Sequence, residues 1–422
     1  MGEPMRKWVI WVTASALYVL VNFHRFAMGV ISDQLMAAFA IAAVGLGGLS
    51  SLYFYLYALL QMPAGILADT WGPRRTITAS AVIMAAGSFV FGVAPDLSTA
   101  YVGRFLVGVG VAAVFVNILK LLADWFPPRY FATMTGLTTT VGFLGGFAAS
   151  GPFAHVVEAV GWRWGFHGVG ILTAVIALGC FWLIRDRPAP LPAAEESPIL
   201  GSLWVVLKTP ETWPVFFAKV GITGTYLAFF ALWGPPYLMQ VYGMTRPEAG
   251  GLIGLGVLGF VAGGTIIGFL SDRLFEQRKL PLLLAGCCYA LFWIGPAGNL
   301  VPASRLGPYL FAFGFFGSSL LLLLSCVKEQ QPERVGVAIA TVNAGGFLSA
   351  AVLQILLGFI LDLNWQGAMR EGARLYPPAA FAWAFRVCLL LMGVAIVSIS
   401  WIREGPAGLP SPAKPSDDSP AP

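Results

Sequence analysis

Positive charges lie inside apolar stretches of this sequence without matching acids. The cations within these stretches are Arg25, Arg104, Lys120, Lys219 and Arg386. The 20 Asp and Glu residues instead fall in the connections, at the ends of the stretches or in the tails. A buried charge without a partner is costly, and an approaching anion restores the Coulomb energy that burial removed. The asymmetry predicts a binding site for a small organic anion, with a carboxylate or phosphate suited to the fork of an arginine.

Helical spacing groups further polar side chains with three of these cations. Tyr18, Asn22 and Arg25 follow one another at i, i+4 and i+7, which places them on one helical face. Two more groups arise in the same way, Asn117 with Lys120, and Thr223 and Tyr226 with Lys219, while Asn343 adds a neutral hydrogen-bonding group. The predicted substrate-binding residues are therefore Tyr18, Asn22, Arg25, Asn117, Lys120, Lys219, Thr223, Tyr226 and Asn343.

Other interpretations of these residues remain open. Arg25 could belong to a structural ion pair, and Lys120 and Lys219 could extend along their helices to the lipid headgroups. The solute could then be neutral or zwitterionic. Tyr53, Tyr57 and Gln61 form an i+4 stripe, which we interpret as packing because aromatic stripes at helical spacing more often fill a core.

The composition requires a membrane. Hydrophobic residues make up 58% of the 422 positions and charged residues 11%, against about 25% charged in soluble proteins. A span of about 20 apolar residues crosses a hydrocarbon core of roughly 30 Å. Twelve such spans are predicted, at residues 8–31, 44–66, 77–94, 100–122, 131–155, 165–184, 213–239, 249–271, 281–298, 307–327, 335–361 and 380–402. The five cysteines lie within these spans, so we expect neither disulfides nor metal ligands from them.

A short motif occurs twice at half-chain spacing. Residues 65–75 read GILADTWGPRR, and residues 268–273 read GFLSDR with Arg278 and Lys279 close behind. Gly268 follows Gly65 by 203 residues, and the same offset carries the first and fourth spans onto the seventh and tenth. The chain is therefore expected to be a duplicated six-span unit.

The repeated motif resembles the signature loop of the major facilitator superfamily. The resemblance implies an all-α integral membrane fold of twelve helices in two six-helix pseudo-repeats, whose halves rock about a central site. It also implies that acids and arginines of the loops lock the cytoplasmic side in the outward-open state. Residues 103–110, GRFLVGVG, are similar to the family's Arg-x-x-x-Gly-x-Gly pattern. The predicted gating residues are Asp69, Arg74, Arg75, Arg104, Asp272 and Arg273.

Two segments resemble the sugar-phosphate and organic-anion permeases of this superfamily. Residues 232–238, LWGPPYL, are similar to a segment of those permeases. Asn22-Phe23-His24-Arg25 resembles their aromatic-x-Asp-Arg sequence, with His24 where an acid is usual. No acid is visible at membrane depth, so His24 or the substrate would have to carry any coupled proton, and exchange or facilitated passage is more natural. A transporter-like sensor that binds the anion is the alternative from another class.

The distribution of basic residues predicts the orientation. Connections on the side of the N-terminus carry most of them, so we expect an inner (plasma) membrane protein with both termini cytoplasmic. We expect bundles at 1–184 and 213–403, a linker at 185–212 and a disordered tail at 404–422. Paired carboxylates, metal-ligand clusters and a nucleophile motif are not seen, so we expect no enzyme activity and no cofactor or metal. The expected partners are an anionic solute and lipid, without nucleic acid, and the expected state is a monomer.

Overall fold

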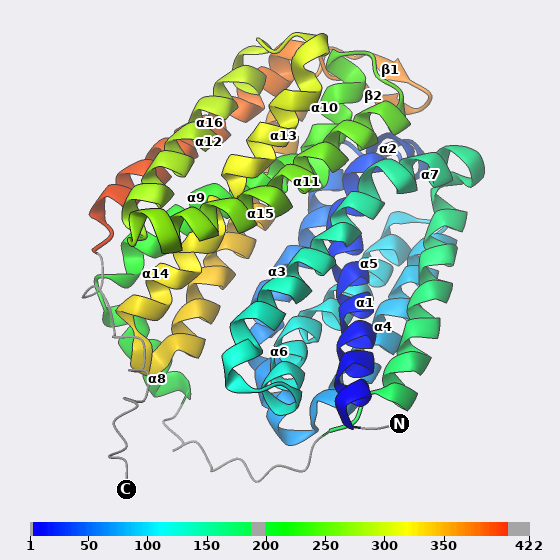
Figure 1. The fold of residues 1–422 in the computed structure, drawn as a ribbon. Helices are drawn as coiled ribbons and strands as arrows, with labels where there is room; N and C mark the ends of the chain where they lie inside the picture. Colours follow the sequence, from blue (N-terminus) through cyan, green and yellow to red (C-terminus); the bar gives the residue numbers. More distant parts are fainter. Residues whose placement is uncertain (1–2, 187–198, 404–422) are drawn as a thin grey trace, which may run out of the picture.

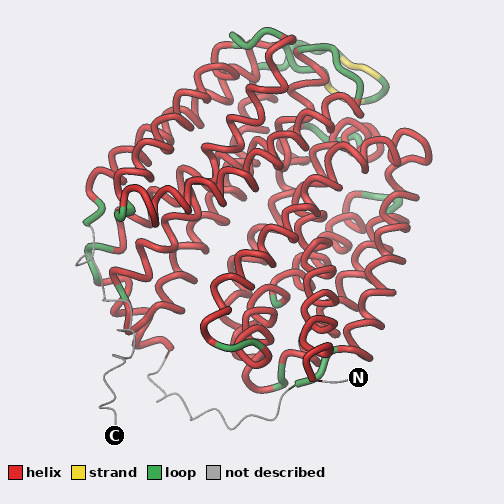
Figure 2. The backbone as a smooth tube through the Cα atoms, in the orientation of Figure 1, coloured by secondary structure: helices red, strands yellow, loops and turns green. Residues whose placement is uncertain are grey.

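The structure, a computed structural model, describes residues 3–186 and 199–403, and almost all of these residues are helical (Figures 1 and 2). The lower end of Figure 1 carries the N-terminus and α8, and the upper end carries α2 and the strands β1 and β2. The helices of the first half are α1 (Glu3–Val30), α2 (Ser32–Phe39), α3 (Ala43–Thr70), α4 (Pro73–Val93), α5 (Leu97–Ala112), α6 (Val114–Trp125), η1 (Pro128–Tyr130) and α7 (Phe131–Leu183).

The second half contains more short helices and one hairpin. Its elements are α8 (Ile199–Lys208), α9 (Thr212–Ala228), η2 (Phe229–Trp233), α10 (Gly234–Val241), α11 (Arg246–Leu270), η3 (Ser271–Phe275), α12 (Lys279–Gly298), η4 (Ala303–Arg305), α13 (Leu306–Gly317), η5 (Ser318–Leu321), α14 (Leu322–Gln330), η6 (Pro332–Arg334), α15 (Val335–Leu363), β1 (Met369–Arg370), β2 (Ala373–Arg374) and α16 (Pro378–Trp401). The antiparallel strands β1 and β2 pair at the upper end.

The helix α7 contains two membrane spans. Its backbone leaves the helical region at Gly161, where φ is 80°, a conformation that glycine adopts at little cost. Eleven helical segments in the described residues are long and apolar enough to cross a membrane, and α7 is one of them. Counted as two spans, α7 raises the total to twelve, which confirms the number expected from the sequence.

Each half contributes helices to a long boundary between the halves. α3 packs along α15, the first span of α7 packs along α11, and α1 contacts η2. Small residues permit the closest approach near the upper end. A Cβ added to Gly47 of α3 would lie 2.5 Å from the carbonyl oxygen of Gln354, and one added to Gly358 would lie 2.6 Å from that of Ala43. The two helices can therefore cross in direct backbone contact only with glycine at these positions.

The expected linker is only partly described. Its end includes α8, which packs against α15. Residues 187–198 and the expected tail at 404–422 lie outside the described residues. The boundaries 1–184 and 213–403 therefore stay predictions from the sequence.

Candidate functional site

Arg25 of α1 is buried, and only one of its three guanidinium nitrogens has a hydrogen-bond partner in the described residues. Its residue is 5% exposed, and Nη1 donates to Oδ1 of Asn22 over 3.0 Å. Nε and Nη2 are buried and have no hydrogen-bond partner within the described part of the chain. Buried polar groups are nearly always paired, so two unpaired donors on one arginine require an explanation.

Aromatic rings from both halves surround this guanidinium. The Cζ atom of Arg25 lies 5.8 Å from the ring centre of Tyr53 and 5.4 Å from that of Tyr57, both on α3. Phe347 of α15 lies 5.3 Å away on the side of the second half. The rings of Tyr57 and Phe347 also contact one another, with centres 4.6 Å apart. The rings stabilise the cation through their faces, and the cage exists only while the two halves are together at this level.

The face predicted on the first span is present. Asn22 donates from Nδ2 to the carbonyl of Tyr18 over 3.1 Å, which orients its oxygen toward Arg25. Tyr18 is buried and stacks on Phe115 of α6, with ring centres 4.9 Å apart. Tyr18 and Asn22 therefore hold Arg25 from its own helix.

Arg104 and His24 form a second buried polar group behind Tyr53. Arg104 is 1% exposed, donates from Nη1 to the His24 carbonyl over 3.4 Å, and lies 5.6 Å from the Tyr53 ring centre. Its Nε and Nη2 also have no partner in the described residues. The His24 Nε2 atom is 3.1 Å from the Ser88 hydroxyl. Tyr53 thus contacts both arginines, which the sequence did not indicate, and Arg104 lies beside the Arg25 group.

Lys120 is placed away from Arg25. Its ammonium donates to the carbonyl of Ala68 over 2.9 Å, near the lower end of α3. Asn117, one turn earlier, is fully buried and donates to the carbonyl of Ala113, while its Oδ1 has no partner in the described residues. The structure therefore separates Lys120 from the Arg25 group.

The predicted residues of the second half line the other side of α15. Lys219 is 3% exposed, and its ammonium donates to the Leu320 carbonyl over 3.2 Å. A Cβ on Gly346 would lie 3.1 Å from Cγ of Lys219 and 3.0 Å from Cβ of Thr223. Because Gly346 precedes Phe347 of the aromatic cage, Lys219 and Arg25 lie against neighbouring residues of one helix.

Two hydroxyl groups on α9 have no partner within the described residues. They are the buried Oγ1 of Thr223 and the buried phenol of Tyr226. Asn343 is half-buried on α15. These groups can supply hydrogen bonds to a solute beside a single fixed cation.

The signature loops form contacts inside their own halves. Arg74 donates to the carbonyl of Phe181 over 2.7 and 3.1 Å, and its backbone N–H donates to Asp186. Arg278 pairs with Asp272 and, over 2.9 Å, with Glu329. Arg75 and Arg273 are exposed. The side chain of Asp69 lies outside the described ones.

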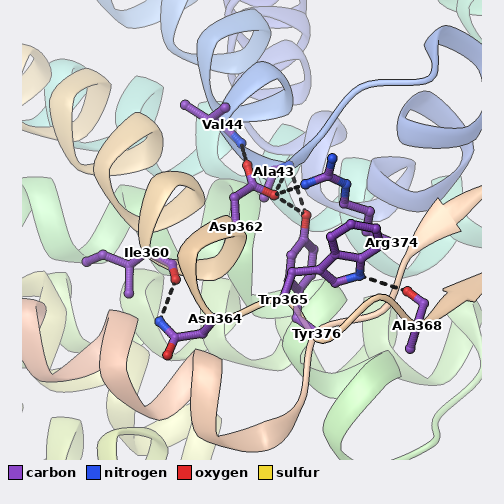
Figure 3. Close-up of polar contacts among 9 residues, drawn as sticks. All are labelled: Ala43, Val44, Ile360, Asp362, Asn364, Trp365, Ala368, Arg374 and Tyr376. Carbon is purple, nitrogen blue, oxygen red and sulfur yellow. Dashed lines mark hydrogen bonds and ion pairs between the residues drawn. The ribbon is translucent and has the colours of Figure 1, made fainter.

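Polar contacts between the halves gather at the upper end (Figure 3). The residue before α3 is Ala42, which has no side-chain acceptor for the first N–H groups of that helix. Asp362 of α15 supplies one, accepting from Ala43 over 3.1 Å and from Val44 over 2.8 Å. Tyr376 and Arg374 donate to the same carboxylate over 2.6 and 3.2 Å. A helix N-terminus favours an anion, so Asp362 joins the two halves by both charge and hydrogen bonds.

A second contact of this kind lies nearby. Arg246, at the start of α11, forms two hydrogen bonds with the carboxylate of Asp33, over 2.7 and 2.8 Å, and a third with the Val30 carbonyl.

In the Asp362 contact, burial raises the pKa of the Tyr376 phenol, which therefore remains a donor to Asp362. The upper end is closed by these contacts and by the crossing of α3 with α15.

Near the lower end, the first span of α7 and α11 enclose a cleft of about 720 Å³. A buried cation between two helical halves, closed on one side and indented on the other, is the arrangement of a membrane transport protein. The sequence matches the Major Facilitator Superfamily over residues 10–352. The chain belongs to this family, and it is a membrane transporter and not an enzyme.

Relatives and solved structures agree with this assignment. A probable galactarate/D-glucarate transporter of Bacillus subtilis is 27% identical, over 91% of this chain and 92% of that protein. A probable sulfoacetate transporter of Cupriavidus necator is 23% identical, over 82% of this chain and 85% of that protein. The crystal structure of a nucleoside transporter has a TM-score of 0.75 at 13% identity, covering 93% of this chain and 99% of that one, which supports the fold alone.

Proposed function

We propose that this transporter moves a small organic anion, a carboxylate or an organic phosphate, and that Arg25 binds its charged group. One observation carries the proposal: a buried guanidinium has no carboxylate partner in the described residues and leaves Nε and Nη2 unpaired. These two nitrogens share one edge of the guanidinium. A carboxylate or phosphate can accept from both at once, which is the strong bidentate geometry.

The surroundings of Arg25 suit this role. An isolated buried charge is unfavourable, and the rings of Tyr53, Tyr57 and Phe347 compensate only part of the lost hydration. An anion bound at the free edge would neutralise the charge and pair both donors. Lys219 and Lys120 each have a carbonyl partner. Arg104 has the same two nitrogens without a partner in the described residues, but it lies behind Tyr53 within the first half. Arg25 also contacts Phe347 of the second half, so it is the cation best placed for a ligand between the halves. The sulfoacetate and galactarate/D-glucarate relatives, both named for organic anions, support the same class of solute.

The proposed transport cycle is alternating access between the two halves. We place the lower end on the cytoplasmic side, because its connections hold most of the basic residues. The structure is then closed to the outside and indented from the inside. Residues 1–184 and 213–403 would move as the two bodies, and Asp69 and Asp272 with their arginines would stabilise the opposite state. Coupling would be by exchange or by a co-transported ion, and His24 is the titratable group nearest to Arg25 in sequence.

Thermal stabilisation of the purified protein tests the proposal. The panel contains sulfoacetate, D-glucarate, phosphorylated sugars, amino acids and neutral sugars. A ligand at 100 times its Kd stabilises the folded state by about 2.7 kcal/mol, and we expect such a shift from one class of anion. Arg25→Ala removes the charged partner, so Kd should rise about thirtyfold or more. Arg25→Lys keeps the positive charge but not the two-pronged guanidinium. Its Kd should lie between those of the parent and Arg25→Ala.

Arg386→Ala is the matched control. Arg386 is also an arginine within a span, but it is exposed and lies 4.3 Å from the ring centre of Trp383. This variant should keep the anion-dependent shift. Stabilisation by neutral solutes that survives Arg25→Ala would contradict the proposal and assign the buried cations to the architecture.

A further inference from the structure

The cleft at the lower end stops at a pair of aromatic rings. It is lined by threonines and apolar side chains of α7 and α11, with Lys328 of α14 also on its wall. Phe143 of α7 and Phe260 of α11 both line it. Their ring centres are 4.5 Å apart, so a ring from each half meets the other across the boundary.

The residues packed behind these rings include predicted binding residues. Phe260 is 2% exposed and packs on Tyr226, with ring centres 4.7 Å apart. Tyr226 is 1% exposed although its phenol has no hydrogen-bond partner in the described residues. The order from the cleft inward is therefore Phe143 and Phe260, then Tyr226. Thr223, one turn earlier on α9, lies against Gly346, the residue before Phe347 of the aromatic cage around Arg25.

We propose that the Phe143–Phe260 pair is the inner gate, the barrier that a solute must part to pass between the lower cleft and the site at Arg25. The assignment rests on the proposed function only in naming Arg25 as the destination. Each ring belongs to a different half, so a movement of α11 away from α7 separates them without breaking a hydrogen bond. The rings present no donor or acceptor that could hold an anion in place. The pair therefore controls passage and the width of the path, while Arg25 controls affinity.

Accessibility of a cysteine behind the rings tests this gate. Thr223→Cys is the reporter, because Thr223 is buried one turn from Tyr226 and a thiol is close to its size. The five native cysteines are first replaced by alanine. The probe is the small anionic reagent sulfonatoethyl methanethiosulfonate, added to purified protein. Phe143→Ala and Phe260→Ala should each raise the rate of modification about tenfold, since either change removes one side of the barrier.

The double alanine variant should add little to either single change, because both rings form one barrier. Phe269→Ala is the matched control, a phenylalanine of the same helix α11 that is 63% exposed. It should leave the rate unchanged. Equal rates in all variants, or an equal rise with Phe269→Ala, would overturn the assignment.

Leucine variants keep the test decisive if alanine at either position prevents folding. Phe260→Leu retains much of the side-chain volume and removes less of the contact with Phe143 than alanine does. It should therefore raise the modification rate by roughly two- to threefold. A Phe260→Leu rate equal to that of the parent would overturn the gate. The modification rate does not depend on which solute is carried. Failure of the anion proposal would appear in the thermal panel, and failure of the gate would appear in the rates.

Discussion

At the upper end, charged groups of one half bind the other half, whereas at the lower end the arginines bind within their own half. Asp362 of α15 holds the start of α3, and Arg246 of α11 holds Asp33. Below, Arg278 binds Asp272 and Glu329 of its own half. The proposed inner gate is an aromatic contact that needs no hydrogen bond. The closure at the upper end is therefore built from several directional hydrogen bonds and ion pairs, and the barrier near the lower end is one contact between rings.

This difference indicates which end resists opening. The first N–H groups of α3 would lose their acceptor if the upper end opened, because Ala42 cannot replace Asp362. Such groups must find water or another partner. Opening at the lower end separates two rings, while the contacts of Arg278 and Arg74 remain intact. The resting conformation should therefore favour the closed upper end.

Asp362→Ala should produce the largest change in how often the upper end opens. It removes the acceptor of the Val44 N–H group, one of the two acceptors of the Ala43 N–H group, and the partner of Tyr376 and Arg374. Loss of a helix cap costs about 1 to 2 kcal/mol, so the upper end should open roughly 5- to 30-fold more often. The measurement is thiol labelling of Ser50→Cys, a fully buried position on α3. Asp362→Asn keeps one acceptor oxygen and should show a smaller rise; equal labelling in parent and alanine variant would show that the carboxylate does not close this end.

Arg246→Ala should also raise Ser50→Cys labelling, but by less than Asp362→Ala does. Its side chain is 13% exposed and that of Asp33 35%, so water replaces part of what is lost. We expect about 1 kcal/mol, or roughly a fivefold rise in Ser50→Cys labelling. Arg305→Ala is the control, because Arg305 is an exposed arginine at the same end. If both substitutions raise labelling equally, the effect belongs to net charge and not to the pair with Asp33.

The architecture and the Arg25 face could be predicted from the sequence. Span length follows from the membrane, and the face of Tyr18, Asn22 and Arg25 follows from the helical period. The repeat offset of 203 residues also pointed to two halves, and the family match confirms that fold. These features depend on local spacing or on composition, which the sequence displays directly.

The partners across the halves could not be predicted in this way. Asp362 and Ala43 are 319 positions apart, and no local pattern marks their contact. The stripe of Tyr53 and Tyr57 was visible, but its interpretation as packing missed their contact with Arg25. Spans that are apolar on every side do not show which face meets which neighbour. The rotation of each helix, and hence the role of Phe347 or Phe260, comes only from the packed structure.

Arg278→Ala should give the smallest effect and sharpens the contrast between the ends. Arg278 joins Asp272 and Glu329 within the second half, and its side chain is 25% exposed. Partly exposed pairs contribute about 0 to 1 kcal/mol, so thermal stability should change little. Because no upper contact involves Arg278, Ser50→Cys labelling should stay within about twofold of the parent. A rise comparable to that of Asp362→Ala would mean that the lower arginines also hold the two halves in this state. The contrast between a polar closure at the upper end and an aromatic barrier near the lower end would then be wrong.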